Sequence, residues 1–113
     1  MINEIFKLFQ NPHKGWDPVP KEYSKKYSLK QWENYDTTIL NDIEQEISGF
    51  DNKRVLDLGG GPGQFSIRMA QMGGDVAWLD ISNNYLAIVK EKALERNVDI
   101  EYQIAYMDDA LKI

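Results

Sequence analysis

Short apolar runs alternate with longer segments of helical periodicity in the second half of the chain. The runs at 54–58, 75–80 and 100–104 predict strands, and the segments 64–72 and 83–96 between them predict helices. Strands that alternate with helices in this way usually lie parallel in one sheet, with the helices packed on it. The pattern therefore predicts an α/β fold.

The first half of the chain has a different pattern. Three prolines and one glycine fall within 11–20, which predicts a loop or an extended arm. The segments 29–36 and 38–47 then predict two helices, and Gly49 stands where a C-terminal helix cap is expected. Apolar residues at helical spacing form one stripe along the second helix, which we expect to pack on the sheet. The stripe consists of Ile39, Leu40, Ile43 and Ile47.

Composition narrows the class of protein only a little. With 113 residues, of which 42% are hydrophobic and 27% charged, the chain has the size and composition of one ordinary globular core. Its net charge of -5 argues against a general nucleic-acid binder, which presents a basic patch. The chain has no cysteine, so disulfides and cysteine-based zinc sites are excluded. We expect a cytoplasmic protein with no metal site and no membrane span.

A run of glycines marks the junction between the first predicted strand and the helix after it. Gly59, Gly61 and Gly63 alternate with other residues, Gly60 lies among them, and Asp57 stands two residues before the first. Glycine is needed where the backbone turns sharply and a ligand lies directly on it, because a Cβ would occupy the ligand's volume. The run therefore predicts a loop that holds a ligand against the start of a helix.

Spacing separates the kinds of ligand that such a loop can hold. The dinucleotide fingerprint requires glycines at offsets of two and five, but those offsets place Gln64 or Ser66 where the last glycine should be. A phosphate-binding P-loop ends in Gly-Lys-Ser/Thr, whereas Gly63 is followed by Gln64. Neither pattern fits, which disfavours a nicotinamide oxidoreductase and a P-loop enzyme.

Three segments together resemble the class I S-adenosylmethionine-dependent methyltransferases. The glycine run with Asp57 resembles motif I of that family. Asp80 ends the second predicted strand 21 residues after Gly59, and the segment 81–86 after it is similar to the family's second motif. The segment 102–111 resembles the part in which an Asp-Ala pair reaches the adenine amino group. The resemblance covers about half of the chain and implies a Rossmann-like fold.

The resemblance also implies a role for each candidate residue. The glycine loop and the helix after it would hold the methionine end of S-adenosylmethionine. Asp57 would face the amino group, directly or through water, or would brace the loop. Asp80 would bind the ribose hydroxyls, Ile81 would pack on the adenine, and Asp109, or else Asp108, would accept from the adenine amine. The predicted cofactor-binding residues are Asp57, Gly59, Gly60, Gly61, Gly63, Asp80, Ile81, Asp108 and Asp109.

Several of these residue types have simpler explanations. Asp is favoured as a helix N-cap, although Ser82 or Asn83 can cap the helix in place of Asp80. An acidic pair in a polar loop is commonly just solvated. His13, the one histidine, is a loop residue rather than a general base.

The resemblance implies that the N-terminal helices form a lid, but the arm's aromatic residues can equally bury area against the sheet. The candidates for that lid are Tyr27, Trp32 and Tyr35.

The expected function is transfer of a methyl group to a small-molecule acceptor, with no catalytic residue assigned. We divide the chain into an arm at 1–53 and a partial cofactor-binding domain at 54–113, and we expect a fragment of a longer methyltransferase. The alternative is a non-catalytic binding fragment or a subunit that needs a partner chain. The first strand would lack a neighbour on one side, which is an aggregation hazard. We therefore expect a second copy, a partner chain or the N-terminal arm to cover it.

Overall fold

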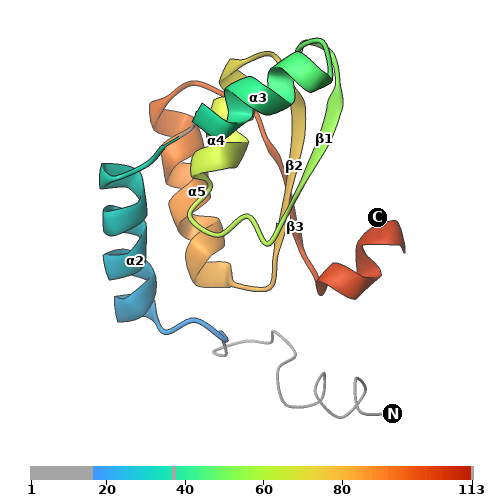
Figure 1. The fold of residues 1–113 in the computed structure, drawn as a ribbon. Helices are drawn as coiled ribbons and strands as arrows, with labels where there is room; N and C mark the ends of the chain where they lie inside the picture. Colours follow the sequence, from blue (N-terminus) through green and yellow to red (C-terminus); the bar gives the residue numbers. More distant parts are fainter. Residues whose placement is uncertain (1–16, 37, 113) are drawn as a thin grey trace.

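The computed structural model describes residues 17–36 and 38–112, with side chains through residue 109. Within these ranges the chain forms a three-stranded parallel sheet flanked by helices (Figure 1). The strands lie in the order β1-β2-β3, each beside its successor in the sequence. The elements are α2 (Lys21–Glu33), α3 (Thr38–Glu46), β1 (Arg54–Leu58), α4 (Gln64–Gln71), β2 (Asp75–Asp80), α5 (Asn83–Glu95), β3 (Glu101–Ile104) and the 3-10 helix η1 (Met107–Lys112). The predicted strands, the two helices between them and the α/β fold are confirmed.

Burial differs between the middle strand and the first strand. Four consecutive residues of β2, 76–79, are buried, as expected for a strand with a neighbour on each side. In β1, Leu56 and Leu58 are 45% and 48% exposed. Among the described residues β1 pairs with β2 alone, in a register that places Leu56 beside Ala77. β1 is therefore an open edge of the sheet in this part of the chain.

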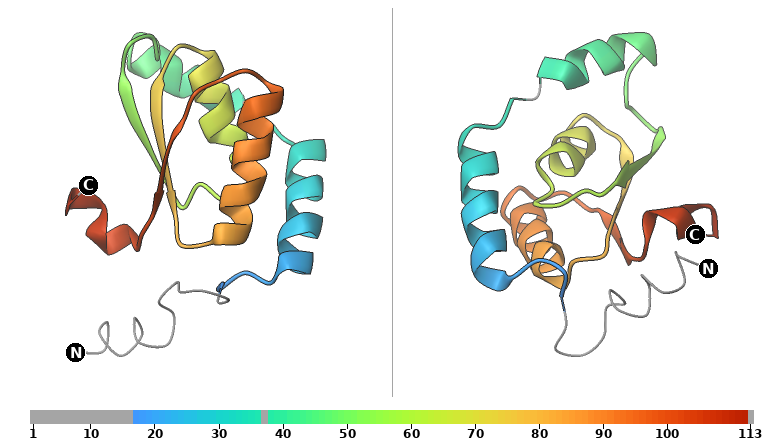
Figure 2. Two further views of the ribbon diagram at one scale, coloured as in Figure 1. Left: turned by 180° about the vertical axis from the view of Figure 1, so that it is seen from behind. Right: turned by 60° about the horizontal axis from the view of Figure 1, so that its bottom comes forward.

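The helices cover one face of the sheet. Figures 1 and 2 show α3, α4 and α5 on the same side. For α4 and α5, the right-handed connections between successive parallel strands require this placement. Side chains alternate between faces along a strand, so Val55 contributes to the helix-covered core while Leu56 and Leu58 lie on the other face. Of the described elements, η1 lies on that second side (Figure 2).

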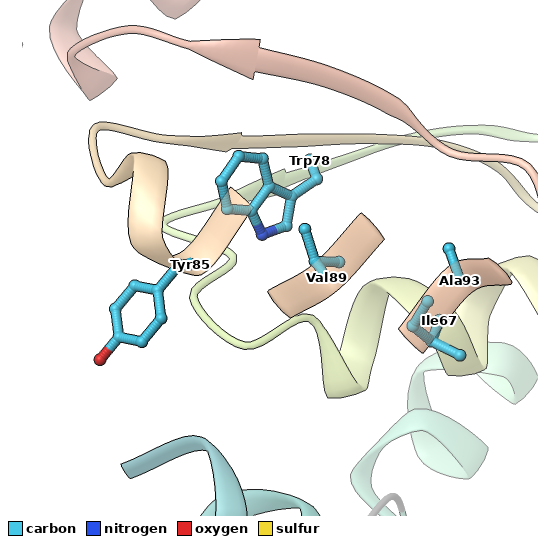
Figure 3. Packing of buried hydrophobic residues seen from close by; sticks show 5 residues of the cluster. All are labelled: Ile67, Trp78, Tyr85, Val89 and Ala93. Atoms are coloured by element: carbon cyan, nitrogen blue, oxygen red, sulfur yellow. The ribbon is translucent and has the colours of Figure 1, made fainter. Parts of the chain in front are cut away.

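Two clusters of buried side chains hold the helices to the sheet. The larger one joins Trp78 of β2 to Ile67 of α4 and to Val89 of α5, and Figure 3 shows these side chains together with Tyr85 and Ala93. The smaller cluster lies under α3 and consists of Leu40, Phe50, Met69 and Val76. The first cluster reaches the glycine loop, because Trp78 and Val89 both lie against it.

The predicted helix at 29–36 is wrong in its bounds. α2 begins at Lys21, directly after Pro20, and ends at Glu33. Its buried residues are Ser24 and Ser28, which are 1% and 5% exposed. A helix that packs through small serines has no apolar stripe, so hydrophobic periodicity could not reveal its first two turns.

The predicted apolar stripe of α3 is only partly correct. Leu40 is buried and Ile47 packs against the same cluster, but Ile39 and Ile43 are 56% and 41% exposed. α3 therefore contacts the core through one row of side chains rather than two. Ser48 and Gly49 both have positive φ, and the Gly49 amide donates to Glu44 O at 2.8 Å, which confirms the predicted helix end.

Candidate cofactor site

The glycine loop connects β1 to α4 and is tied to the end of β2. The amides of Gly59 and Gly60 both donate to Leu79 O, at 2.8 and 3.1 Å. The φ angles of Gly59, Gly61 and Gly63 are +69°, +54° and +86°, a region that favours glycine over residues with a Cβ. The alternate spacing of these glycines thus matches alternate left-handed positions in the backbone.

The space in front of each glycine differs. A Cβ on Gly60 would collide with the Trp78 ring, and one on Gly63 would collide with Val89. In front of Gly61, by contrast, the nearest atom is 3.9 Å away, and it belongs to the loop backbone at Gly59 O. Gly60 and Gly63 are therefore needed for close packing inside the protein, whereas Gly61 leaves open space in the direction its side chain would take.

Two indole rings hold the carbonyl groups of the loop. Trp78, in the core, donates from Nε1 to Gly61 O at a distance of 3.1 Å. Trp32, in α2, donates from Nε1 to Pro62 O at a distance of 3.0 Å. These bonds fix the orientation of consecutive peptide groups at the tip of the loop. A site preorganised in this way loses less conformational entropy when a ligand binds.

Asp80 lies at the carboxyl end of β2 and faces the loop. Its Oδ2 accepts from the Gly61 amide at 3.0 Å, and its Oδ1 accepts from the Ser82 amide at 3.0 Å. Each carboxylate oxygen has a further acceptor position. Ser82 is the N-cap of α5, since its Oγ accepts from the Tyr85 amide at 3.1 Å. The carboxylate of Asp80 is thus free of the capping role.

Asp57 lies at the corresponding end of β1. Its Oδ2 accepts from the buried hydroxyl of Ser66 at 2.6 Å. Burial raises the pKa of Asp57 above its ordinary value, the hydrogen bond from Ser66 opposes the rise, and the negative charge of Asp80 adds to it. A cationic ligand group between these two carboxylates would relieve that cost.

These groups line an open cleft of about 480 Å³. That volume lies within the range usual for sites that bind small molecules and cofactors. α2 supplies one wall of the cleft. Burial raises the pKa of Tyr85, which lies at the start of α5, to about 12. The lining residues are Tyr23, Tyr27, Gln31, Asp57, Gly59, Gly60, Gly61, Pro62, Gln64, Phe65, Asp80 and Tyr85. A smaller cavity of about 230 Å³ between α2 and α5 contains neither the loop nor these carboxylates.

The segment before α2 is anchored at the N-terminus of α5. Asp17 accepts from the Ser82 hydroxyl at 2.9 Å and from the Asn84 amide at 3.0 Å. Asn84 Nδ2 in turn donates to Val19 O at 2.7 Å. The segment that leads into α2 is therefore held by Ser82 and Asn84, which follow Asp80 by two and four residues.

The other end of α2 is anchored by Trp32. Besides its bond to the loop, the Trp32 ring has two cations near its centroid: the ammonium of Lys92 in α5 at 5.3 Å, and the guanidinium of Arg96, the C-cap residue of α5, at 4.4 Å. Cations at such distances are attracted by the face of an aromatic ring. Trp32 is thus fully engaged in structural contacts.

The structure brings together part of the predicted site. The four glycines, Asp57 and Asp80 line the cleft, and so does Tyr27. Ile81 is half-buried but outside the lining, and Asp108 and Asp109 lie in η1, also outside it. His13 lies outside the described residues.

The aromatic residues of the arm divide into two groups. Tyr27 lies at the cleft, whereas Trp32 and Tyr35 pack on each other with ring centroids 5.2 Å apart and do not line it. Tyr23, Gln31, Gln64 and Tyr85 were not predicted as site residues. The position of Gln64 directly after the glycine run could have indicated its role, but Tyr23 and Gln31 could not be placed without the correct bounds of α2.

Two kinds of site find no support in the part of the chain that the structure describes. No three side chains of the histidine, cysteine, aspartate and glutamate types gather there as a metal site would require. Within residues 17–36 and 38–112, no helix has the length and apolar character needed to cross a membrane.

Comparison with known proteins now identifies the family. The model of a methyltransferase domain matches residues 55–112, which span the loop, the cleft carboxylates and η1. The chain belongs to the class I S-adenosylmethionine-dependent methyltransferases. S-adenosylmethionine is the cofactor of this family. The match confirms the resemblance and decides against the dinucleotide alternative.

Curated relatives of this methyltransferase chain include two enzymes named ubiquinone biosynthesis O-methyltransferase. The one from Haemophilus ducreyi is 33% identical over 94% of this chain and 42% of its own length. The one from Shewanella pealeana is 35% identical over 88% of this chain and 39% of its own length. The chain thus spans about two fifths of the length of these relatives.

Solved structures agree with the methyltransferase fold. The crystal structure of TehB from Haemophilus influenzae has a TM-score of 0.60 and 27% identity, covering 80% of this chain and 31% of that one. A protein of Methanococcus maripaludis, assigned to the S-adenosyl-L-methionine-dependent methyltransferases, has a TM-score of 0.63 over 84% of this chain and 46% of its own. At 20% identity, the second likeness shows the fold alone.

Proposed function

We propose that this chain binds S-adenosylmethionine in the cleft of the glycine loop and supplies the cofactor-binding part of a methyltransferase. The observation that carries this proposal is the open space in front of Gly61, bordered by the carboxylates of Asp57 and Asp80. S-adenosylmethionine needs hydrogen-bond acceptors for its α-ammonium group and for its ribose hydroxyls. The cleft has a carboxylate for each, Asp57 and Asp80.

The methionine end fits the loop and the start of α4. Free amides at a helix N-terminus and the positive end of its dipole attract a carboxylate, and the start of α4 lines the cleft. The α-ammonium group fits beside Asp57, whose carboxylate is costly to bury without a cation. Gly61 lets the ligand approach the backbone between these two groups, and Gly59, Gly60 and Gly63 shape the loop that holds it.

The nucleoside end fits the carboxyl end of β2. We assign the ribose hydroxyls to Asp80, whose oxygens have acceptor positions left after their bonds to the Gly61 and Ser82 amides. Ile81 follows directly in the chain and is assigned to the adenine ring. Asp109, or else Asp108, is assigned to the adenine amine on the strength of the family resemblance.

The bound cofactor supplies a methyl group already activated by its sulfonium. The chain's own residues bind and orient it, and such positioning can contribute several kcal/mol to lowering a barrier. Tyr23 and Tyr27 lie at the wall that α2 adds to the cleft, with ring centroids 5.8 Å apart, and aromatic faces attract cations such as a sulfonium. We therefore propose that α2 covers the cofactor as a fixed wall.

We propose that the methyl acceptor is a small molecule. We propose neither nucleic acid nor a membrane as a partner. The curated relatives are named for O-methyl transfer in ubiquinone biosynthesis, which favours an oxygen acceptor. The net charge of -5 argues against a nucleic-acid substrate. We propose no catalytic residue. The second candidate is a non-catalytic binding unit that needs a partner chain, and the open edge at β1 favours it.

Calorimetric titration with S-adenosylmethionine tests the proposal. We expect saturable binding to the unmodified chain and a loss of at least about tenfold in affinity for Asp80→Ala, because a hydrogen bond to a charged group contributes about 1.5 to 3 kcal/mol. Asp75→Ala is the matched control, since Asp75 is exposed at the opposite end of the same strand. Absence of binding would refute the proposal, and equal affinity of Asp80→Ala would refute the ribose assignment.

A further inference from the structure

A buried serine holds one of the two carboxylates at the cleft. Ser66 lies in the first turn of α4, is 0% exposed and is not among the residues that line the cleft. Its Oγ donates to Asp57 Oδ2, near the end of β1, at a distance of 2.6 Å. Asp57 itself lines the cleft. The Ser66 hydroxyl can therefore act on a ligand through this carboxylate without touching the ligand.

The bond favours the ionised form of Asp57. A hydroxyl that donates to a carboxylate lies about 2.5 to 2.7 Å from it, closer than in a bond between neutral groups, and the Ser66 bond falls in that range. Burial raises the pKa of Asp57, the Ser66 hydroxyl opposes this rise, the charge of Asp80 adds to it, and the Ser66 amide opposes it. Ser66 thus supplies the hydrogen bonds that keep the buried carboxylate charged.

The other titratable groups at the cleft come from β2, α2 and α5. Asp80 of β2 is the second carboxylate. Three phenols complete the set, those of Tyr23, Tyr27 and Tyr85. A phenol gains no charge as the pH falls, because its protonated form is neutral. In acid, the charge of the residues that line the cleft therefore depends on the two aspartates.

We infer that Ser66 is a positioning residue whose bond to Asp57 sets how far into acid the chain retains its affinity for the α-ammonium end of the cofactor. The inference rests on the proposed function, which pairs Asp57 with that ammonium group. A protonated carboxyl group no longer attracts a cation. Without the Ser66 hydroxyl, Asp57 would take up its proton at a higher pH, and the affinity would be lost earlier on acidification.

Calorimetry with two probes between about pH 4 and about pH 7.5 tests this role. S-adenosylhomocysteine carries the α-ammonium group, whereas 5′-methylthioadenosine shares its adenosine and thioether sulfur but lacks that group. We expect Ser66→Ala to raise the pH at which half of the affinity for S-adenosylhomocysteine is lost by about one unit or more. The pH dependence of 5′-methylthioadenosine binding, which includes any effect of Asp80 on the ribose, should stay as in the unmodified chain.

Two further variants and a control make the test specific. Ser66→Cys retains a weaker donor of similar size and should shift the half-loss pH in the same direction, which serves if Ser66→Ala does not fold. In an Asp57→Asn background, Ser66→Ala should cause no shift, because the amide does not titrate. Ser28→Ala is the matched control, since Ser28 is also buried and its hydroxyl has no hydrogen-bond partner among the described residues. It should bind both probes like the unmodified chain.

The outcomes that overturn the inference are distinct. An unchanged half-loss pH in both Ser66 variants removes the role of the hydroxyl and leaves the proposed function intact. An equal shift for both probes, or a shift that persists in the Asp57→Asn background, assigns Ser66 to the structure of the loop instead. If the unmodified chain binds neither probe at neutral pH, the proposed function fails and the inference fails with it.

Discussion

The glycines of the loop differ in what each one faces. Gly60 and Gly63 admit Trp78 and Val89 to the backbone, whereas Gly61 faces the cleft. Their spacing predicted the turn, because left-handed positions alternate there. The packing role of Gly60 could not be predicted, because it depends on Trp78. The sheet register places Trp78 beside Asp57 of β1, and from there its ring lies against Gly60.

Gly61→Ala should abolish or strongly reduce S-adenosylmethionine binding. The new methyl group would occupy cleft volume. Because residue 61 has a positive φ, alanine there would also lower the free energy of unfolding by about 1 to 2 kcal/mol. Gly49→Ala is the matched control, because Gly49 has a φ of +94° and open space around it, far from the loop in sequence. Denaturant unfolding should show similar losses of stability for the two variants. Calorimetry that finds equal cofactor affinity for both would contradict the account.

Asp57→Asn should raise stability and lower cofactor affinity. The pKa of Asp57 is raised in the folded chain, so the unmodified protein loses stability as pH rises from the unfolded-state pKa through the higher folded-state pKa. The amide does not titrate and can still accept from Ser66. The stability advantage of the variant, measured by urea unfolding, should therefore grow between about pH 3 and about pH 7. An advantage that shrinks over this range would show that the buried charge is not the cause.

At the scale of elements, α2 is part of the site although it lies far from the loop in sequence. It contributes Tyr23, Tyr27 and Gln31 to the cleft, and Asp17 and Trp32 anchor its two ends. The strands and α4 were predictable because apolar runs and glycines mark them. The start of α2 was not, because its buried face is made of serines.

Asp17→Ala should release the beginning of α2 from α5. The change removes bonds to the Ser82 hydroxyl and the Asn84 amide at a helix N-terminus, where the loss of a cap costs about 0.5 to 2 kcal/mol. Hydrogen exchange should become faster across the α2 amides. Asp36→Ala is the control, since Asp36 accepts from the Thr38 amide at the start of α3. Faster exchange in α2 of the control, or unchanged exchange in Asp17→Ala, would refute the anchoring role.

At the scale of the whole molecule, the sheet is covered on one face, and among the described residues β1 and β3 are its two edge strands. Leu56 and Leu58 lie half-exposed on the uncovered face of β1, and Met107 of η1 is 60% exposed. An apolar edge strand with free backbone groups tends to pair with another chain. The sequence predicted this edge from the number of strands, but it does not reveal what covers it.

We expect the 113-residue chain to associate through this edge. Sedimentation velocity should show a dimer or larger species whose fraction rises with concentration. The double variant Leu56→Lys and Leu58→Lys should shift the distribution toward monomer, because charged side chains discourage pairing at an edge. Leu94→Lys is the control, as Leu94 is 84% exposed on α5. A chain that remains monomeric at every concentration would contradict the expectation.

The central claim is that the glycine loop, Asp57 and Asp80 form the S-adenosylmethionine site. An amide-resolved NMR titration of the ¹⁵N-labelled chain with S-adenosylmethionine tests it most directly. The account predicts saturable shifts concentrated at 57–64 and 80–82, with no comparable shifts when NAD is added. The absence of shifts with S-adenosylmethionine, or shifts confined to the second cavity between α2 and α5, would contradict it.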